Sequence, residues 1–309
     1  MRQHRAPEFP VPGVEKVART RQAFRWMFVQ ALVALGALAA VVPHALAGDG
    51  VAPIPGLSGL TIRVDGEDWG SAARDEVETL LNAVADELTG GAAHGLVSPI
   101  VVRYAAGSPV ALFDKGHDGE YRVHLSARNR GWAQYVYQFG HELCHILSNY
   151  DHRAHDTTRR TTQWFEEALC EAAGLYVLRS MAVRWRTDAP YPGWEAYAPS
   201  LASYAEGLVT EPHRRLPAGV SAASWLKSTL PRLSADPYRR GDNEVVANLL
   251  LPHFERDAAR WVVLRYLNLE AAGSSAGIAG YVREWRKEVP DEHRPFIDAL
   301  ASTLGLAEG

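Results

Sequence analysis

Two histidines spaced four residues apart are the residues of this chain best suited to chemistry. They occur in the segment His-Glu-Leu-Cys-His, from His141 to His145, with Glu142 between them. On a helix, positions four residues apart lie on one face, so both imidazoles can reach one metal ion. Glu142 then lies beside the position that the protein leaves open on the metal, where its carboxylate can act as a general base. The spacing therefore predicts a Zn²⁺ site that activates water for hydrolysis.

A catalytic zinc ion commonly has three protein ligands, so one further residue is required. Three downstream carboxylates are candidates: Asp151, Glu166 and Glu167. A ligating histidine usually donates its other ring nitrogen to a carboxylate, and a residue one helical turn beyond the third ligand is well placed to accept it. Glu171 stands at that position after Glu167, whereas Cys170 stands there after Glu166. This spacing favours Glu167 over Glu166 as the third ligand, with Glu171 as the carboxylate that supports a ligating histidine, and it leaves Asp151 open.

The segment from Trp164 to Ala168 carries a resemblance to a known family. Together with the histidine pair it resembles the gluzincin class of zinc metallopeptidases, in particular the aminopeptidase-like branch with its W-x-x-E-G/A pattern. In that class the glutamate three residues after the tryptophan is the third zinc ligand, which corresponds to Glu167. The resemblance implies a zincin-like catalytic lobe and the hydrolysis of peptide bonds.

A tyrosine further downstream extends the resemblance. In the aminopeptidase-like gluzincins, a tyrosine in a Y-x-K-G pattern donates a hydrogen bond to the oxyanion of the tetrahedral intermediate. The segment Tyr-Arg-Arg-Gly that begins at Tyr238 is similar, with Arg240 in place of the lysine. This likeness implies that Tyr238 is a catalytic residue beside Glu142. His213 and His253 are the alternatives for the oxyanion donor.

A second zinc pattern overlaps the first. The run HELCHILSNYD is similar to the HExxHxxGxxH/D pattern of the metzincins, with Asp151 as its last ligand. That pattern needs a glycine where Ser148 stands, because the chain must turn sharply to bring its third ligand back. It also requires a methionine beneath the metal, and Met181, the only methionine after the N-terminal apolar segment, falls in a predicted helix. Asp151 therefore remains the alternative to Glu167.

The hydrophobic pattern predicts an α+β fold that positions these residues. Apolar residues alternate or cluster in short strand-like segments and recur with helical spacing elsewhere. The predicted strands are residues 60–64, 100–104, 110–113 and 121–125, and the last two form a hairpin. The predicted helices are residues 71–88, 132–148, about 161–186, 194–207, 222–230, 243–254, 258–270, 278–287 and 296–304. The resemblance also implies that the strand at 121–126 lies at the sheet edge and pairs with an extended peptide substrate; an ordinary half-buried strand is the alternative.

The first 47 residues differ from the rest. Six basic residues precede an uncharged run from Trp26 to Val42, and Ala45-Leu46-Ala47 follows as a small-residue cleavage signal, which is the order of a secretory leader. The apolar run is near the shortest length that spans a bilayer, so a retained anchor is the alternative.

The cluster Ala189-Pro-Tyr-Pro-Gly193 predicts a later boundary. The expected parts are a signal peptide or membrane anchor at 1–47, a zincin-like lobe with a small mixed sheet at 48–188, and an all-helical C-terminal lobe at 189–309.

Charge and cysteine content narrow the function classes. The net charge of the 309 residues is −4, and the net +4 of the leader leaves −8 on the remainder, so a basic nucleic-acid footprint is absent. The two cysteines, Cys144 and Cys170, are either buried thiols or a disulfide between the two ligand-bearing helices.

The sequence thus predicts an exported, extracytoplasmic zinc metallopeptidase, a hydrolase that acts on a peptide or protein. It contacts a membrane only if the N-terminal segment is retained. Two alternatives stay open. One is a catalytically inactive, zinc-bound interaction protein with the same fold. The other is a metallo-amidase that acts on cell-wall or modified peptides.

Overall fold

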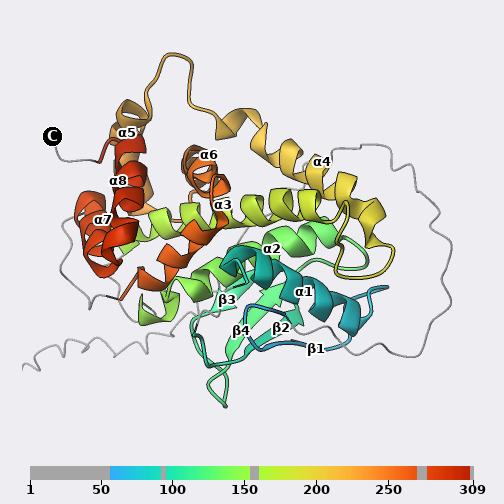
Figure 1. Cartoon of the computed structure of the whole chain (residues 1–309). Coiled ribbons are helices and arrows are strands. Elements are labelled where there is room, and N and C mark those ends of the chain that lie inside the picture. The colour runs from blue at the N-terminus through green and yellow to red at the C-terminus, as the bar shows by residue number, and fades with distance from the viewer. Residues whose placement is uncertain (1–55, 92–94, 154–159, 270–276, 307–309) are drawn as a thin grey trace, which may run out of the picture.

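The computed structural model describes residues 56–91, 95–153, 160–269 and 277–306 (Figure 1). The segment 1–47, expected to be a leader or an anchor, lies outside these residues. Within the described ranges, no helix is both long and apolar enough to cross a membrane.

A small mixed sheet forms one side of the molecule. It contains β1 (Ile62–Asp65), β2 (Ile100–Tyr104), β3 (Val110–Leu112) and β4 (Tyr121–Leu125), in the order β1-β2-β4-β3. The first three strands of this order run parallel, and β3 pairs antiparallel to β4 as a hairpin. Helix α1 (Arg74–Thr89) joins β1 to β2, as a parallel connection requires. The predicted order of strand, helix, strand and hairpin is confirmed.

The expected edge position of the strand at 121–126 is wrong. β4 lies inside the sheet, between β2 and β3, and the short strand β3 forms the edge on that side. The reason is that one side of β4 already pairs with β2. Its hairpin partner β3 can therefore pair only with the other side of β4, where it forms the edge. Tyr121, Val123 and Leu125 alternate as buried residues on one face of β4, which is the pattern of an ordinary half-buried strand.

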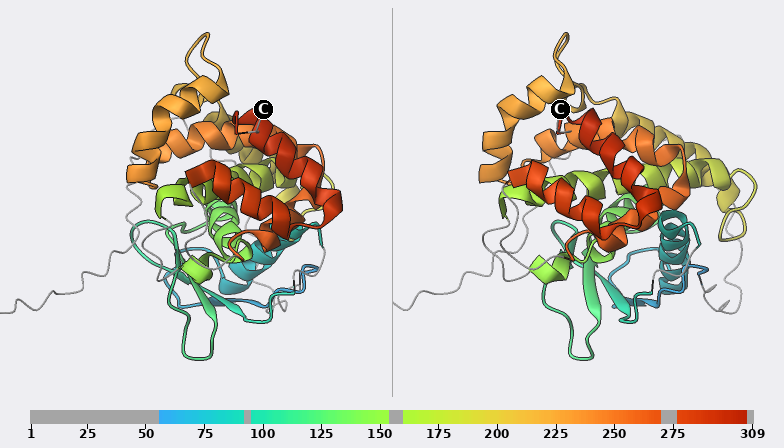
Figure 2. Two further views of the ribbon diagram at one scale, coloured as in Figure 1. Left: turned by 90° about the vertical axis from the view of Figure 1, so that its left-hand side faces the viewer. Right: turned by 60° about the vertical axis from the view of Figure 1, so that its left-hand side comes forward.

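Two long helices carry the candidate ligands. Helix α2 (Trp132–Leu147) bears the histidine pair, and α3 (Arg160–Arg184) bears the glutamates. Residues 164–178 of α3 are all buried, so this helix is surrounded by other elements. In Figures 1 and 2 the sheet lies at the bottom with helices stacked above it, and in Figure 1 α3 runs across the middle.

The chain after α3 is helical in its described residues. It contains α4 (Ala198–Val209), α5 (Ala222–Ala235), α6 (Arg240–Glu255), α7 (Gly277–Glu288) and α8 (Arg294–Thr303), with short 3₁₀ helices η2 (Trp194–Tyr197), η3 (Pro212–Arg214) and η5 (Asp291–His293). The predicted helix at 258–270 is instead a 3₁₀ helix, η4 (Ala258–Tyr266), whose Trp261 ring stacks on Phe254 with the centroids 3.8 Å apart. A further 3₁₀ turn, η1 (Tyr150–Arg153), follows α2.

The buried apolar side chains form one continuous cluster that extends from Leu60 to Leu304. Both sides of the predicted boundary at 189–193 contribute to this cluster, and α3 contacts α2, α4 and α6. The division into two lobes stays a prediction from the sequence.

Two glycines set the distance between α2 and α3. A Cβ at Gly140 would lie 2.5 Å from Val177 Cγ2 and 3.3 Å from the Cα of Gly174. A Cβ at Gly174 would lie 2.9 Å from the backbone oxygen of Tyr137. The helices are therefore closer than any other residue would allow at these points. This close packing brings the side chains of α3 within reach of the histidines on α2.

We expect Gly174→Ala to destabilise the fold by about 1–3 kcal/mol, because the added methyl group collides with backbone atoms that cannot rotate away. The shift between the helices should also weaken zinc binding. The matched control is Gly207→Ala in α4, where an added Cβ meets nothing within 4 Å. Its effect should be neutral or stabilising by up to about 1 kcal/mol, because alanine favours a helix over glycine. Denaturant unfolding and zinc titration of both variants test this, and equal behaviour of the two would contradict it.

Candidate metal centre

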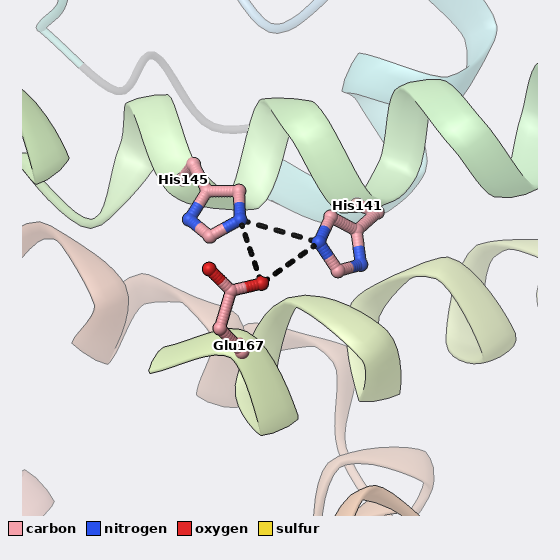
Figure 3. A group of neighbouring side chains, drawn as sticks. All are labelled: His141, His145 and Glu167. Carbon is pink, nitrogen blue, oxygen red and sulfur yellow. Dashed lines mark hydrogen bonds and ion pairs between the residues drawn. The ribbon is translucent and has the colours of Figure 1, made fainter. Parts of the chain in front are cut away.

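His141 and His145 lie one turn apart on the same face of α2 (Figure 3). Their Nε2 atoms are 3.2 Å apart, and both side chains are buried. Leu143, between them in the sequence, packs into the apolar core. The face that carries the imidazoles is therefore separate from the face that holds the helix in the fold, as the helical period requires.

Glu167 of α3 completes a group of three possible metal ligands. Its Oε2 atom lies 3.6 Å from Nε2 of His141 and 3.6 Å from Nε2 of His145, and the three side chains point toward one another in Figure 3. Ligand atoms that are about 2.0–2.1 Å from one zinc ion, at a tetrahedral angle, lie about 3.3–3.4 Å from each other. The observed spacings fit one face of such a tetrahedron.

The hydrogen bonding of Glu167 gives an independent test of this fit. Its side chain is 1% exposed, and within the described part of the chain neither carboxylate oxygen has a hydrogen-bond partner. A buried carboxylate without donors is costly unless a cation compensates it. The residues present therefore fit a divalent metal ion, and two imidazoles with one carboxylate are a donor set typical of catalytic zinc.

Without a metal, protons take its place in this group. Burial opposes protonation of His141, but the carboxylates of Glu167 and Glu171 outweigh it and raise the pKa of His141 to about 9. Burial also opposes protonation of His145, yet Glu167 and Glu166 raise its pKa well above the ordinary value. Burial favours the neutral form of Glu167, but the two histidines lower its pKa to about 2. The group thus binds positive charge strongly, and a metal ion must displace protons from it.

Each imidazole has a carboxylate near its other ring nitrogen. Glu171, the predicted supporting residue, has its Oε2 atom 3.8 Å from Nδ1 of His141. Glu166, which the sequence left as an alternative ligand, lies with Oε1 2.8 Å from Nδ1 of His145. It therefore contacts the ring nitrogen that faces away from the group of three. This second supporting carboxylate was not predicted from the sequence, although the need for one partner per histidine is a signal that points to it.

Glu142, the expected general base, lies beside the group and is not one of the three possible ligands. Its Oε2 atom accepts a hydrogen bond of 2.7 Å from the backbone N–H of Ala111 in the edge strand β3. Burial raises the pKa of the Glu142 carboxyl, and the nearby His141 and His145 partly offset this. A raised pKa brings a carboxylate closer to the range in which it exchanges protons near neutral pH.

Asp151, the alternative third ligand, lies elsewhere in the structure. Its Oδ2 atom forms an ion pair of 3.0 Å with Nζ of Lys115, in the loop between β3 and β4. It does not belong to either group of possible metal ligands among the described residues. The structure thus groups Glu167, and not Asp151, with the histidines.

Tyr238, the expected oxyanion donor, lies at the surface. Its side chain is 44% exposed, and its backbone N–H donates to Asp236. The neighbouring Arg240 reaches inward instead, with Nη2 3.4 Å from the hydroxyl of Tyr137 and Nε 2.6 Å from Glu244. The catalytic role of Tyr238 therefore rests on the sequence resemblance alone.

The two alternative histidines have partners outside the group of three. His253 contacts the hydroxyl of Thr303 at 2.8 Å. His213 lies 2.5 Å from Glu244 and, with Glu211, forms the second group of possible metal ligands. Two guanidinium groups already neutralise these carboxylates: Arg214 contacts both Glu211 and Glu244 at 2.8 Å, and Arg240 contacts Glu244. This group is an ion-pair network and offers a cation little uncompensated charge.

Cys144 and Cys170 are both fully buried and free, so the structure contains no disulfide between α2 and α3. The thiol of Cys144 is 3.9 Å from the hydroxyl of Ser148. The two thiols fill small spaces in the core.

Comparison of the chain with models of known protein families, with curated proteins and with solved structures finds no match.

We expect Glu167→Gln to weaken zinc binding by more than about 100-fold, because it removes the charge of a ligand rather than an outer partner. Asp151→Asn, the matched control, should bind zinc like the unchanged protein and lose only the contact with Lys115. Competition with a chromophoric zinc chelator measures both affinities. A large loss in Asp151→Asn with none in Glu167→Gln would reverse the ligand assignment.

We expect the zinc affinity to increase with pH. The imidazoles of the metal-free protein hold their protons above the ordinary pKa of 6.5, up to about 9 for His141. Zinc binds the neutral imidazole, so binding releases protons, and each released proton strengthens the apparent affinity by roughly tenfold per pH unit. Chelator competition at a series of pH values between 6.5 and 9 measures this, with correction for the chelator's own protonation. An affinity that is constant over that range would contradict it.

Proposed function

We propose that this protein is a zinc-dependent metallopeptidase that hydrolyses a peptide bond or a closely related amide. The observation that carries the proposal is the buried group formed by His141, His145 and Glu167, with Glu142 beside it but outside the ligand set. Three ligand atoms spaced at 3.2–3.6 Å fit zinc, and a zinc ion with three protein ligands would keep one position for water. Zinc binding alone does not require Glu142, whereas hydrolysis requires a base at that position.

A bound zinc ion would lower the pKa of a water molecule toward about 7 and polarise the carbonyl of the substrate. Glu142 would then accept a proton from the attacking water and pass it to the leaving amine. The N–H of Ala111 holds the carboxylate of Glu142 in place between the edge strand and α2. Burial, which raises the pKa of Glu142, makes its carboxylate a stronger base than an exposed one.

The arrangement of elements supports a zincin-like assignment of the region 48–188. Its ligands come from two adjacent helices, α2 and α3, and a small mixed sheet packs beneath the first of them. The antiparallel strand β3 forms the edge nearest the general base, because Ala111 belongs to it. The sequence likeness to the aminopeptidase-like gluzincins at Trp164–Ala168 supports the same assignment.

Export is part of the proposal and rests on the sequence. The order of basic, apolar and small residues in 1–47 is that of a secretory leader. The remaining chain is acidic, so a peptide or protein is the expected partner and a nucleic acid is not. The protein would contact a membrane only through the N-terminal segment.

A second candidate function follows from the burial of the three ligands. His141, His145 and Glu167 are only 4%, 6% and 1% exposed, whereas a substrate carbonyl must reach the metal. This favours, as the alternative, a zinc-bound protein that cleaves nothing and presents its surface to a partner. The two functions differ in one respect that is measurable, which is turnover.

We expect the purified protein to contain one zinc ion per chain and to cleave members of a peptide library, with activity lost in 1,10-phenanthroline and regained with zinc. Glu142→Gln should keep the zinc and lose about 10²- to 10⁴-fold in rate, because it lacks the base. The matched control is Glu87→Gln, which removes another buried carboxylate, one that pairs with Arg184. Its rate should be unchanged.

Peptide cleavage, read by mass spectrometry, and zinc content, read by elemental analysis, decide between the candidates. Zinc without cleavage of any peptide would favour the inactive interaction protein. Cleavage that persists in Glu142→Gln would refute the mechanism. A chain without zinc affinity would remove both candidates.

A further inference from the structure

The supporting carboxylates of the two histidines are themselves held by residues from the helical part of the chain beyond α3. Glu171, beside His141, and Glu166, beside His145, both belong to α3. Both are buried, and each also accepts a hydrogen bond from a residue other than its histidine. The residues that bond to Glu166 and Glu171 therefore determine how firmly the two imidazoles are oriented.

Arg214 holds Glu171. Its guanidinium, at the end of η3, has no exposed side-chain surface, and Nη1 donates to Oε1 of Glu171 at 2.7 Å. Its other nitrogens bond to Glu211 and Glu244, each at 2.8 Å. The hydroxyl of Tyr137, one turn before His141 on α2, lies 2.6 Å from both oxygens of Glu171. Burial favours the neutral form of Glu171, but Arg214 and His141 keep the pKa of this carboxyl well below its ordinary value.

A buried guanidinium is costly unless every side of it is paired. Here its planar fork meets three carboxylates, a geometry that lysine cannot reproduce. The same atoms could have been replaced by apolar side chains if they served only to join η3 to the core, because such replacement is often neutral or stabilising. Stability alone therefore does not account for a buried guanidinium here, and its contact with Glu171 offers a further reason for it.

Asn268 holds Glu166. Its side-chain Nδ2 donates to Oε2 of Glu166 at 2.8 Å and to the backbone oxygen of Ser148 at 2.7 Å, at the end of α2. Its Oδ1 accepts a hydrogen bond of 2.7 Å from the hydroxyl of Tyr281 in α7. The residue has a φ of 60°, a left-handed conformation that asparagine adopts more readily than most side chains. The side-chain amide of Asn268 thus joins the end of α2, α3 and α7.

We propose that Arg214 and Asn268 are positioning residues of the metal centre: Arg214 fixes Glu171 and Asn268 fixes Glu166, so that both histidines direct Nε2 toward the metal. The helical C-terminal part of the chain thereby completes the site from two sides. This inference rests on the zinc site of the proposed function, and it extends that function by assigning a task to the residues beyond α3. It predicts effects on metal binding that do not depend on any substrate.

The test measures zinc affinity and the visible absorption of the Co²⁺-substituted protein in the full chain. In Arg214→Met and in Asn268→Gly, zinc affinity should fall by about 10- to 100-fold, the range typical of lost outer partners. The Co²⁺ bands should shift, because the imidazoles change orientation. Glycine keeps the left-handed backbone at 268 while removing the amide.

Matched controls separate positioning from general damage. Asn129→Gly removes an amide from another left-handed asparagine, whose Oδ1 accepts from the N–H of Ser71 outside the metal centre. Arg286→Met breaks the two-nitrogen contact of another arginine, with Asp298. Both controls should keep the zinc affinity and the Co²⁺ spectrum of the unchanged protein.

A double-mutant cycle asks whether Arg214 acts through Glu171. Adding Arg214→Met to Glu171→Gln should produce little further loss of zinc affinity, since the carboxylate that Arg214 fixes has already lost its charge. If Arg214→Met does not fold, Tyr137→Phe removes one hydrogen bond from Glu171 without exposing a buried charge, and it should weaken zinc binding in the same direction.

The outcomes are distinguishable. Unchanged zinc affinity and spectra in the variants, or equal losses in the controls, would overturn the positioning role while leaving the zinc site intact. Additive losses in the double variant would show that Arg214 does not act through Glu171 and would equally overturn it. An unchanged protein that binds no zinc would instead refute the proposed function itself.

Discussion

Helices α2 and α3 approach so closely at Gly140 and Gly174 that a methyl group at either position would collide with the partner helix. This close contact lets the short side chain of Glu167 reach both imidazoles, with its Oε2 atom 3.6 Å from each Nε2. The positions of the other elements can be understood from this contact between α2 and α3. The sheet packs beneath α2, and the C-terminal helices surround α3, so both ligand-bearing helices are held from several directions.

The contact between α2 and α3 also concentrates acidic side chains in the interior. Their burial is costly unless a hydrogen-bond donor or a cation compensates each one. Four glutamates of α2 and α3 are buried there, and three have partners outside the ligand group. Glu142 accepts from the N–H of Ala111, Glu166 from Asn268, and Glu171 from Arg214 and Tyr137. Within the described residues the oxygens of Glu167 alone among these four lack a hydrogen bond, so this is the carboxylate that a cation would compensate.

Compensation of these charges connects parts of the chain that are distant in sequence. The edge strand supplies a backbone donor, η3 supplies a guanidinium, and Asn268, the second residue after η4, supplies an amide. An arrangement of this kind would orient the candidate ligands before a metal ion bound, so that little ordering would be left for the binding step. It also gives a physical reason for the position of η3 and Asn268 against α3, since each would otherwise leave a buried polar group unpaired.

Much of the site was predictable because it is local. The four-residue spacing of His141 and His145 fits the helical period, and Glu167 was favoured by its one-turn spacing from Glu171 together with a resemblance in one short segment. The hairpin was also predictable, because its two strands are close in sequence. Its place in the sheet was not predictable, because β4 pairs with β2 through long-range contacts, and this pairing leaves β3 at the edge. The contacts of Glu166 with His145, and of Arg214 and Asn268 with the buried glutamates, join residues that are 21 to 102 positions apart. The sequence by itself therefore determined which residues could bind a metal and on which helix faces they lie. Only the tertiary structure decided which charges meet, because the pairing of buried ions depends on how helices cross and carries no periodic signal along the chain.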